Sequence, residues 1–306
     1  MLQFLVKRLG WMLLTIWVVY TASFFLMRAV PGGPFASEKK IAPAIKRNIE
    51  AKFKMDRPLH EQYFSHLWST VQLDLGPSYK LEDYSVNEVI AQGFPVSASL
   101  GIFAMIFALT LGLTAGVISA VHRNSPYDVS FMLLATVGIA VPNFVLASVA
   151  VVLFVFVWPL FPAAGWGQLN QIILPAMCLG APFAGYIARL TRTGMLEVMG
   201  LDYIRTAYAK GLNTRQVVLK HAMRGAILPV VSYLGPATAG ILSGSLVIER
   251  IFALPGMGSH FIEAALQRDY TLAMGMVLVY TVLLFVMNTL VDMSYSIIDP
   301  RVKMEA

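Results

Sequence analysis

Long apolar runs separated by short polar stretches constrain the fold of this chain more than any other feature of its sequence. Hydrophobic residues make up 57% of the 306 positions and charged residues only 13%, whereas soluble domains carry about a quarter charged residues. A helix that crosses a hydrocarbon core of about 30 Å needs roughly 20 mainly apolar residues. The sequence therefore predicts an all-α integral membrane protein with several transmembrane helices.

We expect six transmembrane helices. The first follows Lys7 and Arg8, and we expect it to be an uncleaved anchor because its apolar stretch is too long for a typical signal peptide. The expected helices cover about residues 9–30, 96–121, 129–157, 172–190, 226–248 and 271–298. They divide the chain into residues 1–30 (N-terminus and first helix), 31–93 (a folded segment between helices 1 and 2) and 94–306 (a core domain with the other five helices).

The distribution of lysine and arginine predicts the orientation of these helices. The basic residues at the ends of the apolar runs fall on one side: Lys7, Arg8, Arg123, Arg301 and Lys303, with seven basic and two acidic residues between positions 189 and 224. Because cytoplasmic loops carry an excess of lysine and arginine, we expect both termini to be cytoplasmic. The net charge of +6 then reflects topology rather than binding to nucleic acid.

The segment 31–93 is expected to be folded on the extracytoplasmic side. Two prolines and two glycines in "MRAVPGGP" (27–34) end the first helix. Within residues 43–75, apolar residues repeat every four positions, first at Ile45, Ile49 and Phe53, and then at Tyr63, Leu67 and Val71. This spacing predicts two amphipathic helices, which need the membrane surface or another protein to pack against.

Glycines and prolines mark helix contacts and breaks inside the expected spans. Gly112 and Gly116 form a small-xxx-small pair that permits the close approach of another helix. Pro142, Pro175 and Pro182 are expected to interrupt their helices, so that neighbouring groups or water must satisfy the freed carbonyls. Such breaks are compatible with a moving pathway and with static kinks in a bundle.

Few ionisable residues lie inside the expected spans. Ion-coupled transporters usually bury such residues near the bilayer midplane, so their scarcity argues against that class. Glu249 and Arg250 lie at the outer end of the fifth span. Asn288 and Asp292 share a face near the inner end of the sixth span, where a contact between helices is favoured over a contact with substrate.

No catalytic or nucleotide-binding motif is present, whether a phosphate-binding loop, a nucleophile elbow, a dinucleotide fingerprint or a zinc-protease motif. The five histidines are scattered without the spacing of metal ligands: His60, His66, His122, His221 and His260. His60 and His66 are expected to be solvated helix residues. The single cysteine, Cys178, forms no intramolecular disulfide. We expect no catalytic residues, no metal and no cofactor, and if the protein moves something uphill, the energy must come from a partner.

The longest expected cytoplasmic segment has the pattern of a helical hairpin. "IRTAYAK" (204–210) reads as a short helix, Gly211 can take a positive φ and end it, and Asn213 with Thr214 can cap the next helix. In that second helix Val217, Val218 and Met223 are expected to pack inward, while Arg215 and Lys220 stay exposed. A basic loop that only enforces topology explains the charges but not the alanine and glycine pattern.

The stretch "YIRTAYAKGLNTRQVVLKHAMRGAILPV" (203–230) resembles the cytoplasmic loop of ABC importer permeases. It is similar to the peptide and nickel branch of that family, in which Arg-Thr-Ala replaces Glu-Ala-Ala. Further matching segments occur in the same order along the chain: "MRAVPGGP", "FPVSASLG" (94–101), "ERIFALPGMG" (249–258), "RDY" (268–270) and "DPR" (299–301). The resemblance covers essentially the whole chain and is greatest to bacterial oligopeptide permeases. Arg250 departs from the small or neutral residue expected after the glutamate.

The resemblance implies a permease subunit that imports oligopeptides across the bacterial inner membrane. The implied partners are a second homologous permease, two ABC ATPase subunits that hydrolyse ATP, and an extracytoplasmic peptide-binding protein that docks on unidentified residues within 31–93. The hairpin 201–229 would contact an ATPase through five residues: Arg205, Thr206, Ala207, Lys210 and Gly211. Dipeptides, nickel and antimicrobial peptides remain alternative substrates within the branch. An ion-coupled secondary transporter or an intramembrane enzyme is disfavoured by the missing residues.

Overall fold

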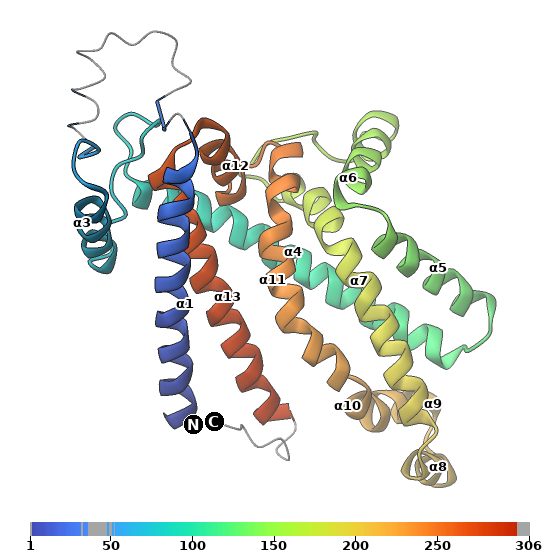
Figure 1. The fold of residues 1–306 in the computed structure, drawn as a ribbon. Coiled ribbons are helices and arrows are strands. Elements are labelled where there is room, and N and C mark those ends of the chain that lie inside the picture. The colour runs from blue at the N-terminus through green and yellow to red at the C-terminus, as the bar shows by residue number, and fades with distance from the viewer. Residues whose placement is uncertain (1, 32, 36–47, 49–50, 52, 299–306) are drawn as a thin grey trace.

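A computed structural model describes residues 2–31, 33–35, 48, 51 and 53–298. Long helices form a bundle with a small helical hairpin at one end and a short helix with loops at the other (Figure 1). The α-helices are α1 (Leu2–Ala29), α3 (Leu59–Val71), α4 (Val86–Val121), α5 (Pro126–Ala140), α6 (Asn143–Val151), α7 (Leu169–Met199), α8 (Asp202–Ala209), α9 (Thr214–Gln216), α10 (Met223–Ala226), α11 (Leu228–Ile251), α12 (Met257–Gln267) and α13 (Tyr270–Ile298). Two π-helical segments, Val152–Val157 and Val217–Ala222, extend α6 and join α9 to α10.

The number of membrane-crossing helices lies between four and six among the described residues, by length and composition. Four continuous helices qualify: Val6–Ala29, Val86–Val121, Leu169–Met199 and Tyr270–Leu290. Two bent pairs qualify only when each pair is counted as one span: Pro126–Ala140 with Asn143–Val157, and Thr214–Ala226 with Leu228–Gly235. The fold is therefore helical with several spans, and six is the upper end of the observed range.

The span expected over residues 129–157 consists of two helices, α5 and α6, and the expected interruption at Pro142 is present. The chain turns by 109° between α5 and α6. Val141 takes an extended conformation there, and Pro142 precedes the first residue of α6. A proline disfavours helical geometry in the residue before it and lacks the N–H that would continue the ladder. The expected interruption at Pro142 is thus a sharp corner, not a kink.

Helix α7 is longer than expected and is not interrupted by its prolines. It continues to Met199, nine residues beyond the expected end at residue 190, so that Arg192 also lies inside the helix. Pro175 and Pro182 both lie within its continuous helical stretch. Neighbouring helices enclose α7, and such enclosure lets a membrane helix tolerate proline.

Glycine contacts fix α7 at the centre of the bundle. A Cβ built at Gly112 of α4 would lie 2.6 Å from Ile187 Cγ2, and one built at Gly116 would lie 2.6 Å from the Ala188 carbonyl oxygen. On α7 itself, a Cβ at Gly185 would lie 2.5 Å from the carbonyl oxygen of Ala135 in α5. The predicted role of Gly112 and Gly116 in close packing is therefore confirmed, since no side chain fits at these contacts.

The end of the bundle opposite the hairpin carries α3. Tyr63 of α3 packs against Tyr20 and Phe24 of α1. The second of the two predicted amphipathic helices is thus present, whereas the first lies mostly outside the described residues. Helix α4 begins at Val86, about two turns before the predicted domain boundary at residue 93, with Ser85 and Glu88 forming a capping box.

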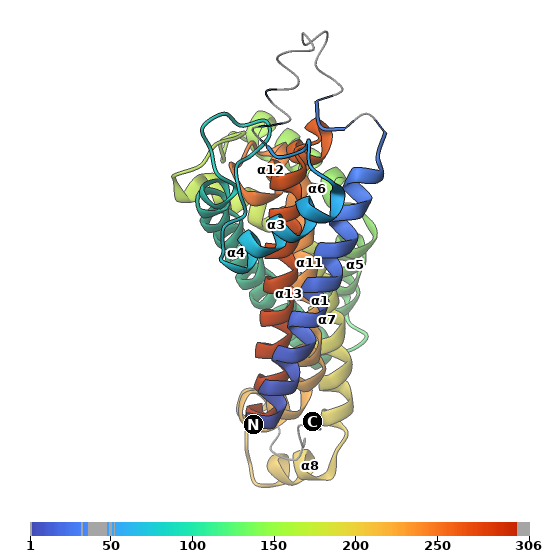
Figure 2. The ribbon, with the colours of Figure 1, turned by 60° about the vertical axis from the view of Figure 1, so that its left-hand side comes forward.

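Helices α1 and α13 lie side by side in both views of the ribbon (Figures 1 and 2). Near the hairpin end, Arg8 of α1 and Asp292 of α13 form an ion pair. The predicted helix contact at Asp292 is therefore present. The start of α1 and the end of α13 share the end of the bundle that carries α8.

Candidate functional site

The hairpin is built from two short helices joined at a glycine corner. Helix α8 ends at Ala209, and Gly211 follows with φ +83°. Within the described part of the chain, no heavy atom lies within 4 Å of a Cβ built at Gly211, so the backbone conformation alone favours glycine there. Asn213 then caps α9: its Oδ1 accepts a hydrogen bond of 2.9 Å from the Gln216 N–H. The predicted corner and cap are both present.

The five predicted contact residues divide between an outer and an inner face of the hairpin. Arg205, Thr206, Lys210 and Gly211 are exposed, whereas Ala207 is buried. Arg205 Nη1 lies 3.3 Å from Asp202 Oδ1, and the side chain of Arg205 remains 76% exposed. Ala207 thus supports the hairpin from within, and the other four positions form its free surface.

The inner face of the hairpin packs on the ends of α4 and α7. Ile204 and Ala207 from α8 and Val217 and Val218 from the π-helical turn are buried in one cluster with Ala120, Met195, Val198, Ala222 and Ala226. Met223 is half-buried, while Arg215 and Lys220 are exposed, as predicted. The hairpin is therefore seated on the membrane helices and is not a loose loop.

A backbone contact between α7 and α10 also holds the hairpin against the membrane helices. A Cβ built at Gly194 of α7 would lie 2.7 Å from the carbonyl oxygen of Ala226 in α10. The last two turns of α7 consequently touch α10 through glycine and the hairpin cluster through Met195 and Val198. The hairpin and the end of α7 are therefore in direct contact.

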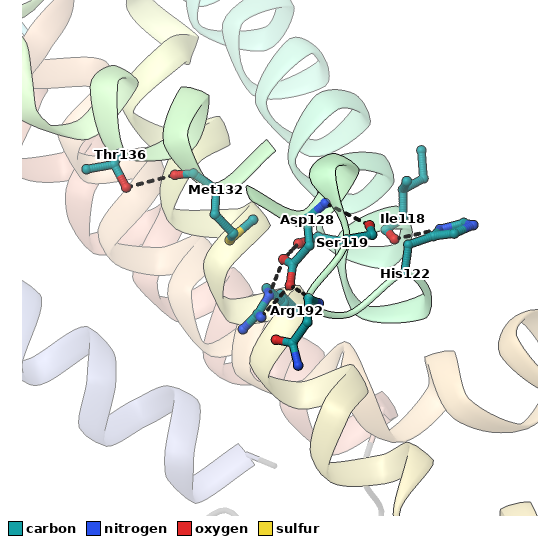
Figure 3. Close-up of polar contacts among 9 residues, drawn as sticks. Ile118, Ser119, His122, Asp128, Met132, Thr136 and Arg192 are labelled. Carbon is teal, nitrogen blue, oxygen red and sulfur yellow. Dashed lines mark hydrogen bonds and ion pairs between the residues drawn. The ribbon is translucent and has the colours of Figure 1, made fainter. Parts of the chain in front are cut away.

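An ion pair between the buried Asp128 and the half-buried Arg192 lies beside the hairpin contact, and the sequence did not predict it (Figure 3). Arg192 of α7 donates two hydrogen bonds of 2.7 Å, from Nε to Asp128 Oδ1 and from Nη2 to Asp128 Oδ2. The Ser119 hydroxyl of α4 also donates to Asp128 Oδ1, and the Asn124 N–H donates to Oδ2 at 2.9 Å. Asp128 is 4% exposed. The two partners stand 64 positions apart, and both lie just outside the expected spans, so the sequence offered no signal for the pair.

Two further buried carboxylates lie at the opposite end of the bundle. Glu249 at the end of α11 accepts hydrogen bonds from the Ser97 hydroxyl at 2.7 Å and from the Gly258 N–H at 2.8 Å. Asp269 accepts from the Tyr79 N–H at 3.1 Å and the Leu272 N–H at 3.1 Å. These bonds explain the glutamate of "ERIFALPGMG" and the aspartate of "RDY" as structural acceptors that hold loops onto helix ends.

The histidines do not converge, and among the described residues no three histidine, cysteine or carboxylate side chains gather as a metal site. His60 is exposed. His66 is not solvated as predicted: its Nδ1 lies 2.9 Å from the Tyr20 hydroxyl, and its Nε2 is buried with no hydrogen-bond partner among the residues that the structure describes. It borders a cavity of about 210 Å³ under α3 that also touches Arg28 and Asp74. Burial, followed by the charge of Arg28, lowers the pKa of His66 to about 4.

Two family models match the chain. The family described as "Binding-protein-dependent transport system inner membrane component" matches residues 112–304. The family described as "Binding-prot-dependent transport system membrane comp, N-term" matches residues 1–101. The first of these two ranges includes the whole hairpin and the ends of α4 and α7 on which it packs.

Curated relatives align over almost the whole chain. The oligopeptide transport system permease protein OppB of Haemophilus influenzae is 45% identical over 305 residues, covering 99% of this chain and 100% of the relative. OppB of Escherichia coli K12 is 43% identical with the same coverage. The dipeptide transport system permease protein DppB of Bacillus subtilis is 45% identical over 304 residues, covering 99% of each chain.

Solved structures show the same fold at low identity. A chain of the inward-facing MetNI methionine ABC transporter superposes with a TM-score of 0.55 and 17% identity, covering 69% of this chain and 96% of that chain. A chain of an amino acid ABC transporter superposes with a TM-score of 0.52 and 14% identity, covering 68% and 93%. The matched families and full-length relatives show that this chain belongs to the inner membrane components of binding-protein-dependent transport systems and is close to the OppB and DppB peptide permeases.

Proposed function

We propose that the chain is the permease subunit of an ATP-driven importer that carries oligopeptides across the bacterial inner membrane. The observation that carries this proposal is full-length identity of 43–45% to OppB permeases. Dipeptides are a second candidate substrate class, because DppB of Bacillus subtilis is as similar as the OppB relatives. The chain would be non-catalytic, and partner ATPase subunits would hydrolyse ATP.

In this proposal the hairpin couples the permease to an ATPase. Its exposed residues Arg205, Thr206 and Lys210 would touch the ATPase, while buried Ala207 and the corner at Gly211 would hold the contact in shape. A seated hairpin suits this role, because the push of a partner on α8 reaches α7 through packed side chains. Such rigid packing transmits displacement because protein interiors are close-packed.

The hairpin also gives the proposed orientation. ATPases operate where ATP is present, so the hairpin would face the cytoplasm. The start of α1 and the end of α13 lie at the same end of the bundle, and both termini would therefore be cytoplasmic. A second, homologous permease would complete the pathway.

The opposite end would receive peptide from an extracytoplasmic binding protein. Within segment 31–93, α3 presents three large apolar side chains to the outside: Phe64, Trp68 and Val71, which are 64%, 65% and 66% exposed. An exposed apolar face of this kind suits contact with a protein or with the membrane surface. Another side of α3 packs on α1 through Tyr63, so this apolar face is left for contact with another molecule, and we assign it to the binding protein.

The test reconstitutes the chain with a second permease, two ATPases and a binding protein in proteoliposomes. Uptake of labelled peptides, from dipeptides to pentapeptides, is measured together with ATP hydrolysis. Arg205→Ala should lower uptake about tenfold through the loss of one charge-assisted contact. Lys7→Ala, an exposed basic residue at the same end of the bundle, should leave it unchanged.

The length series separates the two substrate classes. Uptake confined to dipeptides would replace the oligopeptide assignment with the dipeptide one. Absence of ATP-dependent uptake of every peptide by the complete wild-type assembly would refute the proposal. Equal uptake by Arg205→Ala and the wild type would remove Arg205 from the ATPase contact.

A further inference from the structure

Helix α5 is held to the bundle by few buried residues. Of its described side chains, only Asp128 and Ala135 are buried. Ala135 marks the backbone contact with Gly185 midway along the helix. Most of the large apolar residues of α5 face outward, with Val129, Leu133 and Leu134 each more than 60% exposed. At the hairpin end, therefore, the position of α5 depends on Asp128.

The carboxylate of Asp128 joins three elements at once. Ser119 binds it from α4, the Asn124 N–H from the turn between α4 and α5, and Arg192 from α7 (Figure 3). The pair with Arg192 uses both guanidinium nitrogens and both carboxylate oxygens. A two-bond pair of this kind fixes orientation as well as distance. Apolar packing alone would restrain the same helices less strictly.

The residues that hold Asp128 adjoin the residues that hold the hairpin. Ser119 precedes Ala120, which is buried in the hairpin cluster, and Arg192 lies one helical turn before Met195 of the same cluster. Gly194, between them, contacts Ala226 of α10. Each of the two membrane helices under the hairpin thus carries a hairpin contact next to an Asp128 contact.

We infer that Asp128 and Arg192 are positioning residues that make α5 follow the hairpin when an ATPase displaces it. The inference rests on the proposed coupling function and extends it to residues that touch neither ATPase nor peptide. Helix α5 leads through the 109° corner at Pro142 into α6, and α6 packs against α7 and α11. A displacement at the hairpin end would therefore reach the other end of the bundle by two routes, one through α7 itself and one through α5 and α6.

The test separates positioning from simple stability. Asp128→Asn leaves the half-buried Arg192 guanidinium without its carboxylate, and Arg192→Met leaves the buried Asp128 carboxylate without its counter-charge, whereas the double variant Asp128→Asn/Arg192→Met removes both charges. The complete transporter in proteoliposomes is assayed for thermal unfolding, ATP hydrolysis and peptide uptake. Glu263→Gln, an exposed carboxylate at the opposite end of the bundle, is the matched control and should behave as the wild type.

We expect the double variant to recover most of the thermal stability lost in the single variants. Its peptide uptake per ATP hydrolysed should nevertheless stay about tenfold below the wild type, in the range that coupling residues reach. If uptake per ATP recovers together with stability, the pair only neutralises a buried charge and the inference is wrong.

A second readout does not depend on the substrate. Amide hydrogen exchange of the assembled complex is compared with and without a non-hydrolysable ATP analogue. In the wild type both residues 202–209 and residues 126–140 should change, and in the double variant only residues 202–209. A wild type without peptide uptake that still shows this pattern would refute the peptide assignment alone. An unresponsive 126–140 segment in the wild type would overturn the inference.

Discussion

Ser97 and Glu249, 152 positions apart, are joined by a hydrogen bond of 2.7 Å from the Ser97 hydroxyl to Glu249 Oε1. Ser97 Oγ in turn accepts a bond of 2.9 Å from the Met257 N–H, and Glu249 Oε2 accepts one of 2.8 Å from the Gly258 N–H. Both side chains are buried. This relay ties α4, α11 and the start of α12 together, and its polar groups satisfy one another away from water.

Glu249→Leu should destabilise the protein because it leaves the Ser97 hydroxyl and the Gly258 N–H without their acceptor. Each unsatisfied buried donor costs about 1–3 kcal/mol, so the midpoint of thermal unfolding in detergent should fall clearly. Ser97→Ala should have a smaller effect. Glu263→Gln, with an exposed side chain, serves as the control, and an unchanged midpoint in Glu249→Leu would contradict the role of the relay.

Gly211→Val should weaken the association of the chain with its ATPase while leaving membrane insertion intact. The positive φ of +83° costs a β-branched residue about 1–3 kcal/mol. Because no heavy atom lies within 4 Å of the added Cβ, the effect isolates backbone strain from steric overlap. Gly211→Asn is the matched control, since asparagine tolerates this region. The affinity of purified ATPase for the reconstituted permease measures the effect, and equal affinity of the valine and asparagine variants would refute it.

Gly194→Ala should separate α7 from α10, because the new Cβ would lie 2.7 Å from the Ala226 carbonyl oxygen. Overpacking of this kind costs about 1–3 kcal/mol. Gly10→Ala adds the same methyl group to α1, where no atom of the described residues lies within 4 Å. A comparison of the two thermal midpoints in detergent tests the prediction, which fails if Gly194→Ala unfolds no earlier than Gly10→Ala.

Acid should destabilise the segment around α3 through His66. The pKa of His66 is lowered to about 4 in the folded state, against about 6.5 in the unfolded chain. The unfolded state therefore binds more protons between these values, and stability falls as the pH drops from about 6.5 toward about 4, by about 3 kcal/mol in total. Thermal unfolding followed by tryptophan fluorescence across this range measures the loss. His66→Gln should show a flatter pH dependence, and identical curves for the two proteins would exclude His66 as the cause.

Hydropathy and local backbone conformation depend on residues that are close together in the sequence. The features that follow from these two properties were therefore predicted correctly. The apolar runs indicated the membrane helices, and Gly211 with Asn213 indicated the corner and cap of the hairpin. The pair Gly112 and Gly116 indicated a close helix contact. Each of these signals arises within a few neighbouring residues.

Features that depend on distant partners were missed or misjudged. Pro142 and Pro175 look alike in the sequence, yet the chain turns by 109° beside Pro142 and α7 passes through Pro175 without a break. The difference lies in the neighbours, since α7 is enclosed by other helices while α5 is largely exposed. The first predicted amphipathic helix lies mostly outside the described residues and stays a prediction.

Hydrophobicity, glycine conformation and helix caps act locally, and for this reason the helical membrane fold and the basic hairpin could be predicted from the residues alone. The inward position of Ala207, the buried acceptors Glu249 and Asp269, and the pairing of Asp128 with Arg192 depend on contacts between distant parts of the chain. A buried charge is stable only beside its partners, and the partners of Asp128 come from three elements that fold together.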